Sequence, residues 1–369
     1  MTAAEAKFLL DPYLDWTKRE GIPIHEDFAV DLVTAETGPW PRLGDGCSGA
    51  FVHLGGRGDW MTVFLLDVPP GGASAPQRHL YDEMFYVLSG TGRMVVEMPD
   101  GGQHTFDWGP RSLFALPLNA RYRIFNGSGR EPVRLASAND LRILMNIFHD
   151  ETFFFDNPFA FAERDGMAGY YSGEGKMTSI RPGRHLWETN FVPDLGSFAL
   201  KPWEARGAGS SNIQFLLSEG SMGAHVSEMP VGAYKKGHRH GAGLHIFFIH
   251  GTGYTLLWYE GDRDFQRVDW RHGMCFAPPE NMFSQHFATS AQPARYLAIG
   301  FGTKRYPVVL ARRLGSEGRR TDVSLKEGGS QIEYPDQDPR IHALWLEELR
   351  KTGVRSEMGC ENERGPTNA

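Results

Sequence analysis

The chain has 369 residues, of which 41% are hydrophobic, and a formal net charge of -7 from 38 Lys and Arg against 45 Asp and Glu. This length corresponds to about two domains. No apolar run approaches the ~20 residues that a membrane helix needs, and the first residues lack the basic start and apolar core of a signal peptide, so we expect a cytoplasmic protein without a membrane partner. An acidic chain without a block of Lys or Arg also argues against nucleic acid as a partner and leaves a small molecule.

Residues 1–44 are expected to form an arm that is helical over about residues 3–20 and otherwise extended. From residue 45 to 149 the pattern changes to short apolar runs, at 61–68, 84–90, 92–98 and 112–118, with glycine, proline and Asp-Gly turns between them. Short strands at close intervals with turn signals are typical of a β-sandwich or barrel. We therefore predict a first barrel over residues 45–149.

Residues 150–204 are rich in aromatic side chains and are interpreted as an inter-domain linker. Strand-like runs at 246–251, 254–260, 274–279 and 294–302 then predict a second barrel over residues 205–310. Residues 311–369 form a C-terminal extension, with a helix predicted over 338–351 and a polar tail that is expected to be disordered. The predicted fold class is all-β, with two tandem barrels and short terminal helices. Those terminal segments lead us to expect a homodimer or a larger homo-oligomer.

The two barrel regions are copies of one another at an offset of 161 residues, which becomes 162 in the middle of the barrel. A one-residue insertion in a hairpin explains the change of offset. Matches of so many different residue types indicate two related domains. The matched pairs are Pro69 with Pro230, Gly71 with Gly232, His79 with His240, Asp107 with Asp269, Trp108 with Trp270, Pro117 with Pro279, and Arg134 with Arg295.

His238 and His240 lie just ahead of a strand-like run, in the sequence GHRHGAGLHIFFIHG. Side chains at positions i and i+2 of an extended chain project to the same face, so two imidazoles can converge on one ion. Neutral imidazole is the commonest protein metal ligand. The pair therefore predicts a metal site in the second barrel.

Each repeat resembles a cupin domain, a jelly-roll barrel, so the chain is similar to a bicupin. In the first cupin motif a glycine, an HxH pair, a glutamate and a second glycine follow at set distances. The second repeat matches it at Gly232, His238, His240 and Gly251, with Leu244 in the place of the glutamate. Its second motif keeps Gly273 and Pro279, with Ser284 in the place of the last cupin histidine and Ala288 in the place of the asparagine.

His286 lies two residues beyond Ser284 in the sequence FSQHFA, and on a strand these two positions share a face. We therefore predict a metal site that consists of His238, His240 and His286. Fe(II) is the first choice of ion, with Zn, Mn, Ni or Cu as alternatives, because imidazole-rich sites suit all of them. The candidate catalytic residues, which would position substrate or dioxygen, are Ser284, Gln285 and His250.

The first repeat keeps other parts of the motifs. His79 and Glu83 remain, whereas Gln77 and Tyr122 replace histidines. One imidazole and one carboxylate give poor affinity for a transition ion. These four residues are interpreted as a site for an organic ligand or, alternatively, as a structural hydrogen-bond network.

The resemblance also implies a function, because cupins without the glutamate include iron dioxygenases for thiols, β-diketones and aromatic acids such as gentisate. The first hypothesis is a metal-dependent bicupin of this kind, a non-haem Fe(II) dioxygenase whose small chelating substrate meets dioxygen in the second barrel. One alternative is a non-redox Zn or Mn cupin, an isomerase, decarboxylase or hydrolase. The other is a small-molecule-binding bicupin without catalysis. An aromatic lining would suit a flat substrate, and its expected members are Phe247 or Phe248, Trp258, Phe283 and Phe287.

Overall fold

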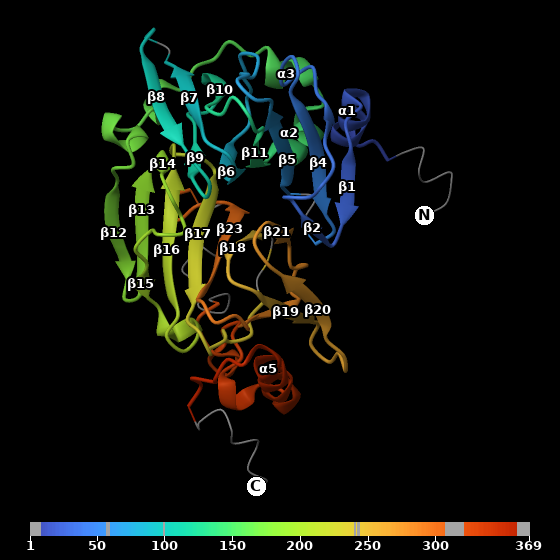
Figure 1. Cartoon of the computed structure of the whole chain (residues 1–369), viewed down its shortest axis with the longest axis vertical. Coiled ribbons are helices and arrows are strands. Elements are labelled where there is room, and N and C mark those ends of the chain that lie inside the picture. Colours follow the sequence, from blue (N-terminus) through green and yellow to red (C-terminus); the bar gives the residue numbers. More distant parts are fainter. Residues whose placement is uncertain are drawn as a thin grey trace.

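The computed structural model describes residues 9–56, 60–98, 100–239, 241, 244–306 and 321–359. Figure 1 shows two barrels, with α1, α2 and α3 beside the first and α5 against the second. Their regular structure is mostly strand, so the predicted all-β class with two tandem barrels is confirmed. No helix of these residues is long and apolar enough to cross a membrane.

The first barrel consists of two sheets. The larger sheet is 8-stranded in the order β1-β4-β5-β11-β6-β9-β14, with β3 added beside β4, and the smaller sheet has the order β10-β7-β8. The bounds of these strands are Ile24–Asp27 for β1, Gly38–Pro39 for β3, Ser48–Leu54 for β4, Thr62–Val68 for β5, Glu83–Ser89 for β6, Gly92–Glu97 for β7, Gln103–Trp108 for β8, Leu113–Ala115 for β9, Arg121–Asn126 for β10, Val133–Asn139 for β11 and Phe191–Val192 for β14.

The second barrel repeats this arrangement. Its larger sheet is 9-stranded in the order β12-β13-β16-β17-β23-β18-β21-β2, with β15 added beside β16, and its smaller sheet has the order β20-β19-β22. The bounds are Ala29–Asp31 for β2, Lys176–Arg181 for β12, Arg184–Thr189 for β13, Lys201–Pro202 for β15, Ser211–Leu217 for β16, Met222–Met229 for β17, Leu244–His250 for β18, Gly253–Trp258 for β19, Gln266–Trp270 for β20, Met274–Phe276 for β21, Phe283–Ala288 for β22 and Ala294–Phe301 for β23.

The central strands of the large sheets are buried on both faces. In β5, Val63 and Leu65 belong to a hydrophobic cluster shared by both barrels, whereas Phe64 and Leu66 fill the inside of the first barrel. A strand that is buried on both faces carries a continuous apolar run instead of an alternating one. This explains the long apolar runs of the sequence and places a common core between the barrels.

Short helices flank the barrels. The predicted N-terminal helix is α1 (Pro12–Glu20), which begins at an Asp11 cap and ends at Gly21 with φ 73°. The predicted C-terminal helix is α5 (Pro339–Thr352), which begins at an Asp338 cap and packs Ile341 and Trp345 against the second barrel. The sequence did not predict α2 (Leu141–Phe148) and α3 (Glu151–Phe155).

Short 3₁₀ turns occur in the connecting segments. They are η2 (Ala162–Arg164), η3 (Ala168–Tyr171), η4 (Glu204–Arg206), η6 (Leu325–Glu327) and η7 (Tyr334–Asp336). The predicted disordered tail includes residues 360–369, which lie outside the described residues.

The segment 150–204 is more than the linker that the sequence predicts. It supplies β12 and β13 to the large sheet of the second barrel, and β14 to the large sheet of the first, where Phe191 pairs with Phe114. The N-terminal arm crosses in the other direction, because β2 pairs with β21 of the second barrel. Each barrel is therefore completed by a strand from outside its own repeat.

A buried acidic pair joins the barrels. Asp82 and Asp140 belong to the first barrel, and Ser221 of the second barrel donates its backbone N–H to Asp82 and its hydroxyl to Asp140, at 2.6 and 3.0 Å. Burial, and secondarily the charge of Asp82, raise the pKa of Asp140 to about 8. Asp140 therefore carries its proton at neutral pH.

We expect Asp140→Asn to flatten the dependence of the melting temperature on pH. The folded pKa of about 8 lies above the ordinary value of 3.8, so the stabilisation due to the bound proton is complete below pH 3.8 and is lost as the pH rises through about 8. Asparagine resembles the protonated acid and does not ionise. Thermal melts over this pH range measure the effect, with Asp45→Asn at an exposed position as the control. Equal slopes in wild type and Asp140→Asn would contradict the prediction.

Candidate functional site

Equivalent residues of the two repeats form equivalent backbone pairs in the two barrels. Gln77 forms a bridge with Tyr122 in the first barrel, and His238 forms the equivalent bridge with Ser284 in the second. Ser74 N donates to Ile124 O at 2.8 Å, and Lys235 N donates to His286 O at 3.0 Å. These pairs obey the offsets of 161 and 162 found in the sequence. The interiors of the two barrels can therefore be compared position by position.

The first barrel encloses a hydrogen-bond network around Glu83. His79 Nε2 lies 2.9 Å from Glu83 Oε2, and the Tyr122 hydroxyl donates to the same oxygen at 3.0 Å. Ser137 donates its hydroxyl to Oε1. His79 Nδ1 lies 3.2 Å from the Tyr81 carbonyl, and its Nε2 also lies 3.1 Å from the Tyr122 hydroxyl. Burial and the charge of Glu83 raise the pKa of Tyr122 well above its ordinary value and keep it a donor.

Gln77 does not join this network. Its Nε2 donates to the backbone carbonyls of Arg42, Leu43 and Ala75. Of the four predicted ligand-binding residues of the first barrel, the structure therefore brings together His79, Glu83 and Tyr122, and places Gln77 as a support for a neighbouring loop. The other three form the closed network that the sequence left open as the alternative.

His286 points into the second barrel from β22. Its Nδ1 lies 2.8 Å from the Thr255 hydroxyl, which also accepts from Trp270 Nε1 at 3.1 Å. Its ring centroid is 5.0 Å from that of Tyr296 on the opposite sheet. Ser284 is buried on the same face, in keeping with the two-residue spacing. The side chain of His286 is thus held by a polar chain inside the barrel.

His238 lies at the same end of the barrel as Ser284, with which it exchanges backbone hydrogen bonds. Arg206, at the end of η4, donates to His238 Nδ1 at 2.5 Å. A guanidinium can only donate, so Nδ1 is an acceptor and a neutral ring carries its proton on Nε2. In this form His238 offers a hydrogen-bond donor instead of a metal lone pair. His240 lies outside the described residues.

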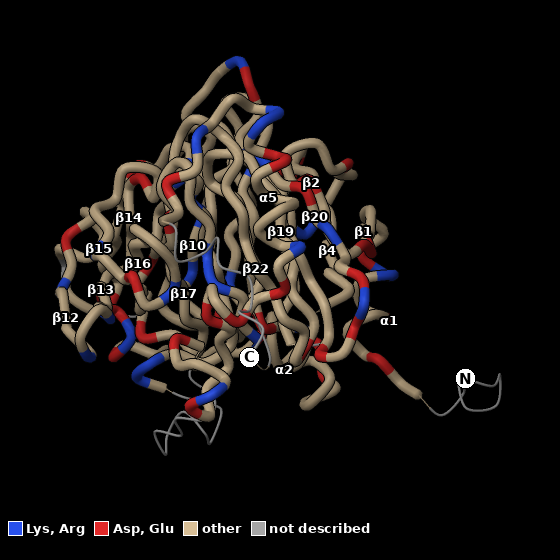
Figure 2. Tube along the Cα trace, turned by 90° about the horizontal axis from the view of Figure 1, so that it is seen from below, with Lys and Arg blue, Asp and Glu red and all other residues tan. Residues whose placement is uncertain are grey.

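Two cationic side chains are enclosed in the second barrel. Charges of opposite sign alternate along the outside of the molecule in Figure 2, but the interior differs. Lys235 is 1% exposed, and its Nζ lies 3.1 Å from the Tyr296 hydroxyl. Arg206 is 3% exposed and also donates to the Gln331 side chain and the Lys236 carbonyl. Among the described residues, no carboxylate forms an ion pair with either side chain.

Burial and nearby positive charge act on Lys235. Burial in the barrel, followed by the charges of Arg206 and Arg184, holds the pKa of Lys235 well below its ordinary value. Burial also raises the pKa of Tyr296, which therefore keeps its proton. The end of the barrel thus combines an amine, a guanidinium and a phenol, and the charges of Asp322 and Glu333 act on Arg206 without a described ion pair.

The first barrel has none of these groups at the same positions. Ser74 corresponds to Lys235, Leu135 to Tyr296, and Ile124 to His286, at the offsets of 161 and 162. Leu135 and Ile124 are ordinary members of the apolar core of the first barrel. Small or apolar side chains at these positions are therefore sufficient for the fold. The requirements of the fold do not explain the polar residues at the same positions of the second barrel.

Comparison with known families finds one match. Residues 64–139, within the first barrel, match the family model of the cupin domain. The architecture of this barrel recurs in the second barrel.

Solved structures of similar fold agree with this. The oxalate decarboxylase of Lactobacillus farciminis, in its formate complex, is 12% identical with a TM-score of 0.50, over 78% of this chain and 90% of that one. A variant of Bacillus subtilis oxalate decarboxylase is 14% identical with a TM-score of 0.50, over 78% and 81%. At these identities the likeness shows the fold alone. No curated protein matches the sequence.

The structure describes His238 and His286 of the predicted metal site. No three His, Cys, Asp or Glu side chains among the described residues are placed to hold a metal ion. The Arg206 guanidinium donates to Nδ1 of His238. The site of His238, His240 and His286 stays a prediction, because His240 lies outside the described residues.

Two of the candidate catalytic residues lie outside the second barrel. Gln285 points to the outer face, where its Nε2 donates to the Lys235 carbonyl and to Gln337 at 2.8 and 3.1 Å. His250 follows a β-bulge in β18 and donates from Nδ1 to the Pro293 carbonyl at 2.9 Å. Burial lowers the pKa of His250. The bulge breaks the alternation from which an inward direction was expected, and only Ser284 faces the interior.

The predicted aromatic lining divides between two places. Phe248 is inside the second barrel, stacked on Trp270 with ring centroids 4.2 Å apart. The others lie outside it: Phe247 faces the first barrel, and Trp258, Phe283 and Phe287 pack under α5. The sequence could not distinguish these faces, because both are apolar.

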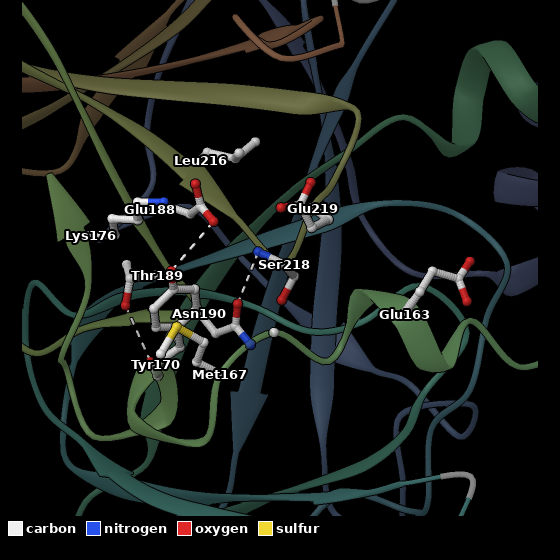
Figure 3. A pocket seen from close by; sticks show the side chains of 11 residues that line it. Glu163, Met167, Tyr170, Lys176, Glu188, Thr189, Asn190, Leu216, Ser218 and Glu219 are labelled. Atoms are coloured by element: carbon white, nitrogen blue, oxygen red, sulfur yellow. Dashed lines mark hydrogen bonds between the residues drawn. The ribbon is translucent and has the colours of Figure 1, made fainter. Parts of the chain in front are cut away.

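A pocket of about 170 Å³ lies outside both barrels (Figure 3). Glu188 and Glu219 on its wall both pair with Arg305, and Asn190 accepts from Ser218 N at 3.1 Å. Its principal charges are therefore neutralised within the protein. The lining residues are Glu163, Gly166, Met167, Tyr170, Lys176, Glu188, Thr189, Asn190, Leu216, Ser218 and Glu219.

Lys235→Met is expected to stabilise the ligand-free protein. Methionine has a similar length and no charge to desolvate, so we expect a gain of about 1–2 kcal/mol and a melting temperature higher by about 2–8 °C. Thermal melts without added anions measure it. Lys201→Met, in the exposed strand β15, is the matched control. A lower melting temperature for Lys235→Met alone would mean that the amine stabilises the empty barrel.

Tyr122→Phe is expected to destabilise the protein by about 1–3 kcal/mol, because Glu83 and His79 lose a buried partner. The melting temperature measures this loss. Tyr259→Phe, at a residue that is 45% exposed, controls for removal of a hydroxyl. Equal melting temperatures for the two variants would show that the network in the first barrel does not support the fold.

Proposed function

We propose that the second barrel binds a small organic carboxylate. The observation that carries the proposal is the enclosure of Lys235 and Arg206 in one barrel, each buried and without a described carboxylate partner. Buried charges are normally paired, because leaving the solvent costs several kcal/mol per ion. An anionic ligand supplies the missing partner.

The neighbouring groups favour a carboxylate in particular. Arginine binds carboxylates through two parallel N–H bonds, and a tyrosine hydroxyl and an imidazole N–H add further donors. Tyr296 is the residue that offers a hydroxyl here. Phe248, Trp270 and Phe276 fill the adjoining part of the barrel, which limits the ligand to a small one.

Among the functions considered from the sequence, non-redox chemistry or simple binding agrees best with this site. The oxalate decarboxylases of similar fold are named for a small dicarboxylate, the ligand class proposed here. The iron dioxygenase hypothesis depends on a metal site that includes His240, which lies outside the described residues. We therefore do not extend it to this chain.

Isothermal titration of the full chain with oxalate, formate and acetate, after treatment with a chelator, tests the proposal. We expect at least one of these anions to bind, and Lys235→Met to weaken its binding by about tenfold or more, because a hydrogen bond to a charged group contributes about 1.5–3 kcal/mol. Methylammonium, a cation of similar size, is expected not to bind.

Lys201→Met is the control in this experiment and should bind the anion as the wild type does. Absence of binding by all three anions would overturn the proposal. Binding that disappears with the chelator and returns with a metal ion would also overturn it, in favour of the predicted histidine site.

A further inference from the structure

We infer that a strap from the C-terminal extension, residues 323–337, closes the second barrel when no ligand is bound, and that the carboxylate of the ligand displaces it from Arg206. This inference rests on the proposed function and concerns the regulation of that site. It treats Gln331 as an internal substitute for the ligand. The strap lies between two fixed points, which are the ion pair of Arg181 with Asp322 at 2.6 Å and the start of α5.

The strap pairs with the backbone at the rim of the second barrel. The N–H of Arg239 donates to the Ser330 carbonyl at 3.1 Å, and the N–H of Ile332 donates to the Gly237 carbonyl at 2.8 Å. Gln331 stands between these two bonds and is 1% exposed. The strap therefore crosses this end of the barrel and encloses the side chain of Gln331.

Gln331 occupies the guanidinium that the proposed function assigns to the ligand. Its Oε1 accepts from Arg206 Nη1 at 2.5 Å, and its Nε2 donates to the Ala205 carbonyl at 2.9 Å. Arginine binds a carboxylate through two N–H bonds and an opposite charge, whereas an amide oxygen offers neither a second bond nor a charge. A carboxylate is therefore the better partner for Arg206. The space that it needs is the space that the Gln331 side chain leaves.

The strap is held less firmly than the cover of the first barrel. There the chain after β11 covers the corresponding stretch, because Leu80 N donates to the Phe154 carbonyl at 2.8 Å and the Phe154 side chain is buried in the core. In the strap, Ile332 stays half-buried, and Glu333 forms an ion pair with Lys236 at 2.5 Å. Segments with few buried apolar side chains open locally at a low cost in free energy. The strap can therefore open while the barrel stays folded.

Calorimetric titration of Gln331→Leu with oxalate, formate and acetate tests the exchange at Arg206. Leucine has a similar volume and accepts no hydrogen bond, so the ligand no longer competes with a side chain of the strap. We expect the affinity to rise about tenfold or more, because a hydrogen bond to a charged group is no longer lost on binding. Gln337→Leu is the matched control. Gln337 belongs to the same strap but contacts Tyr234 and Gln285, so this variant should bind as the wild type does.

Gln331→Glu changes the same position in the opposite direction. A carboxylate here pairs with Arg206 and holds the strap in place, and the neighbouring Glu333 is already paired with Lys236. We expect the anion to bind about tenfold more weakly or worse than to the wild type. A purely structural role of Gln331 would instead weaken binding in both variants and would overturn the inference.

Hydrogen exchange of the full-length wild type, followed by mass spectrometry, measures the opening itself. Saturation with the tightest-binding anion is expected to raise the exchange rates of the Ile332 and Arg239 amides about tenfold, because opening breaks their hydrogen bonds. The amides of α5 are the internal control and should exchange at an unchanged rate.

Equal affinities of the wild type and both Gln331 variants, with slower exchange of the strap amides in the complex, would overturn the inference and leave the carboxylate site intact. An equal gain in affinity for Gln331→Leu and Gln337→Leu would overturn the exchange at Arg206. Failure of all three anions to bind either the wild type or Gln331→Leu would overturn the proposed function as well.

Discussion

The enclosure of two cationic side chains in one barrel is the constraint on which the functional interpretation depends. Charged groups are poorly solvated inside a jelly-roll barrel, and neither Lys235 nor Arg206 forms an ion pair with a described carboxylate. Arg206 in turn fixes the hydrogen-bonding state of His238, and Lys235 contacts Tyr296. These two residues make this end of the second barrel rich in hydrogen-bond donors and positive in charge.

The two barrels show how one backbone supports opposite interiors. In the first, a carboxylate is present and is fully engaged by a histidine, a tyrosine and a serine. In the second, the carboxylate position is Leu244, and the charge has the other sign. In the first barrel the polar groups around Glu83 hydrogen-bond to one another. In the second barrel no described carboxylate forms an ion pair with Lys235 or Arg206. This difference supports the proposal that the second barrel, and not the first, binds a ligand.

Much of the fold could be predicted from the sequence, because the repeat, the turns and the apolar runs are local signals. The inward direction of His286 could be predicted as well, since β22 is regular. The direction of the His250 side chain could not be predicted, because a bulge in β18 reverses it. The directions of Gln285 and Trp258 could not be predicted either, because α5, which is far away in sequence, covers the outer face of their strands. Lys235 and Arg206 were missed because neither stands at a defined position of the cupin motifs: Lys235 is one of the variable residues between Gly232 and His238, and Arg206 precedes the motif. The signal that could have revealed Lys235 was its alignment with Ser74, a charged residue opposite a small one.

The exchange of strands has a consequence for how the chain acquires its structure. β2 is among the first parts to be synthesised, yet its partner β21 follows more than two hundred residues later. The first barrel likewise waits for β14, which belongs to the segment after it. Neither barrel can close its sheet edges during the synthesis of its own repeat alone. We therefore regard the two barrels as one cooperative folding unit, in which the halves are not interchangeable with separate cupin domains.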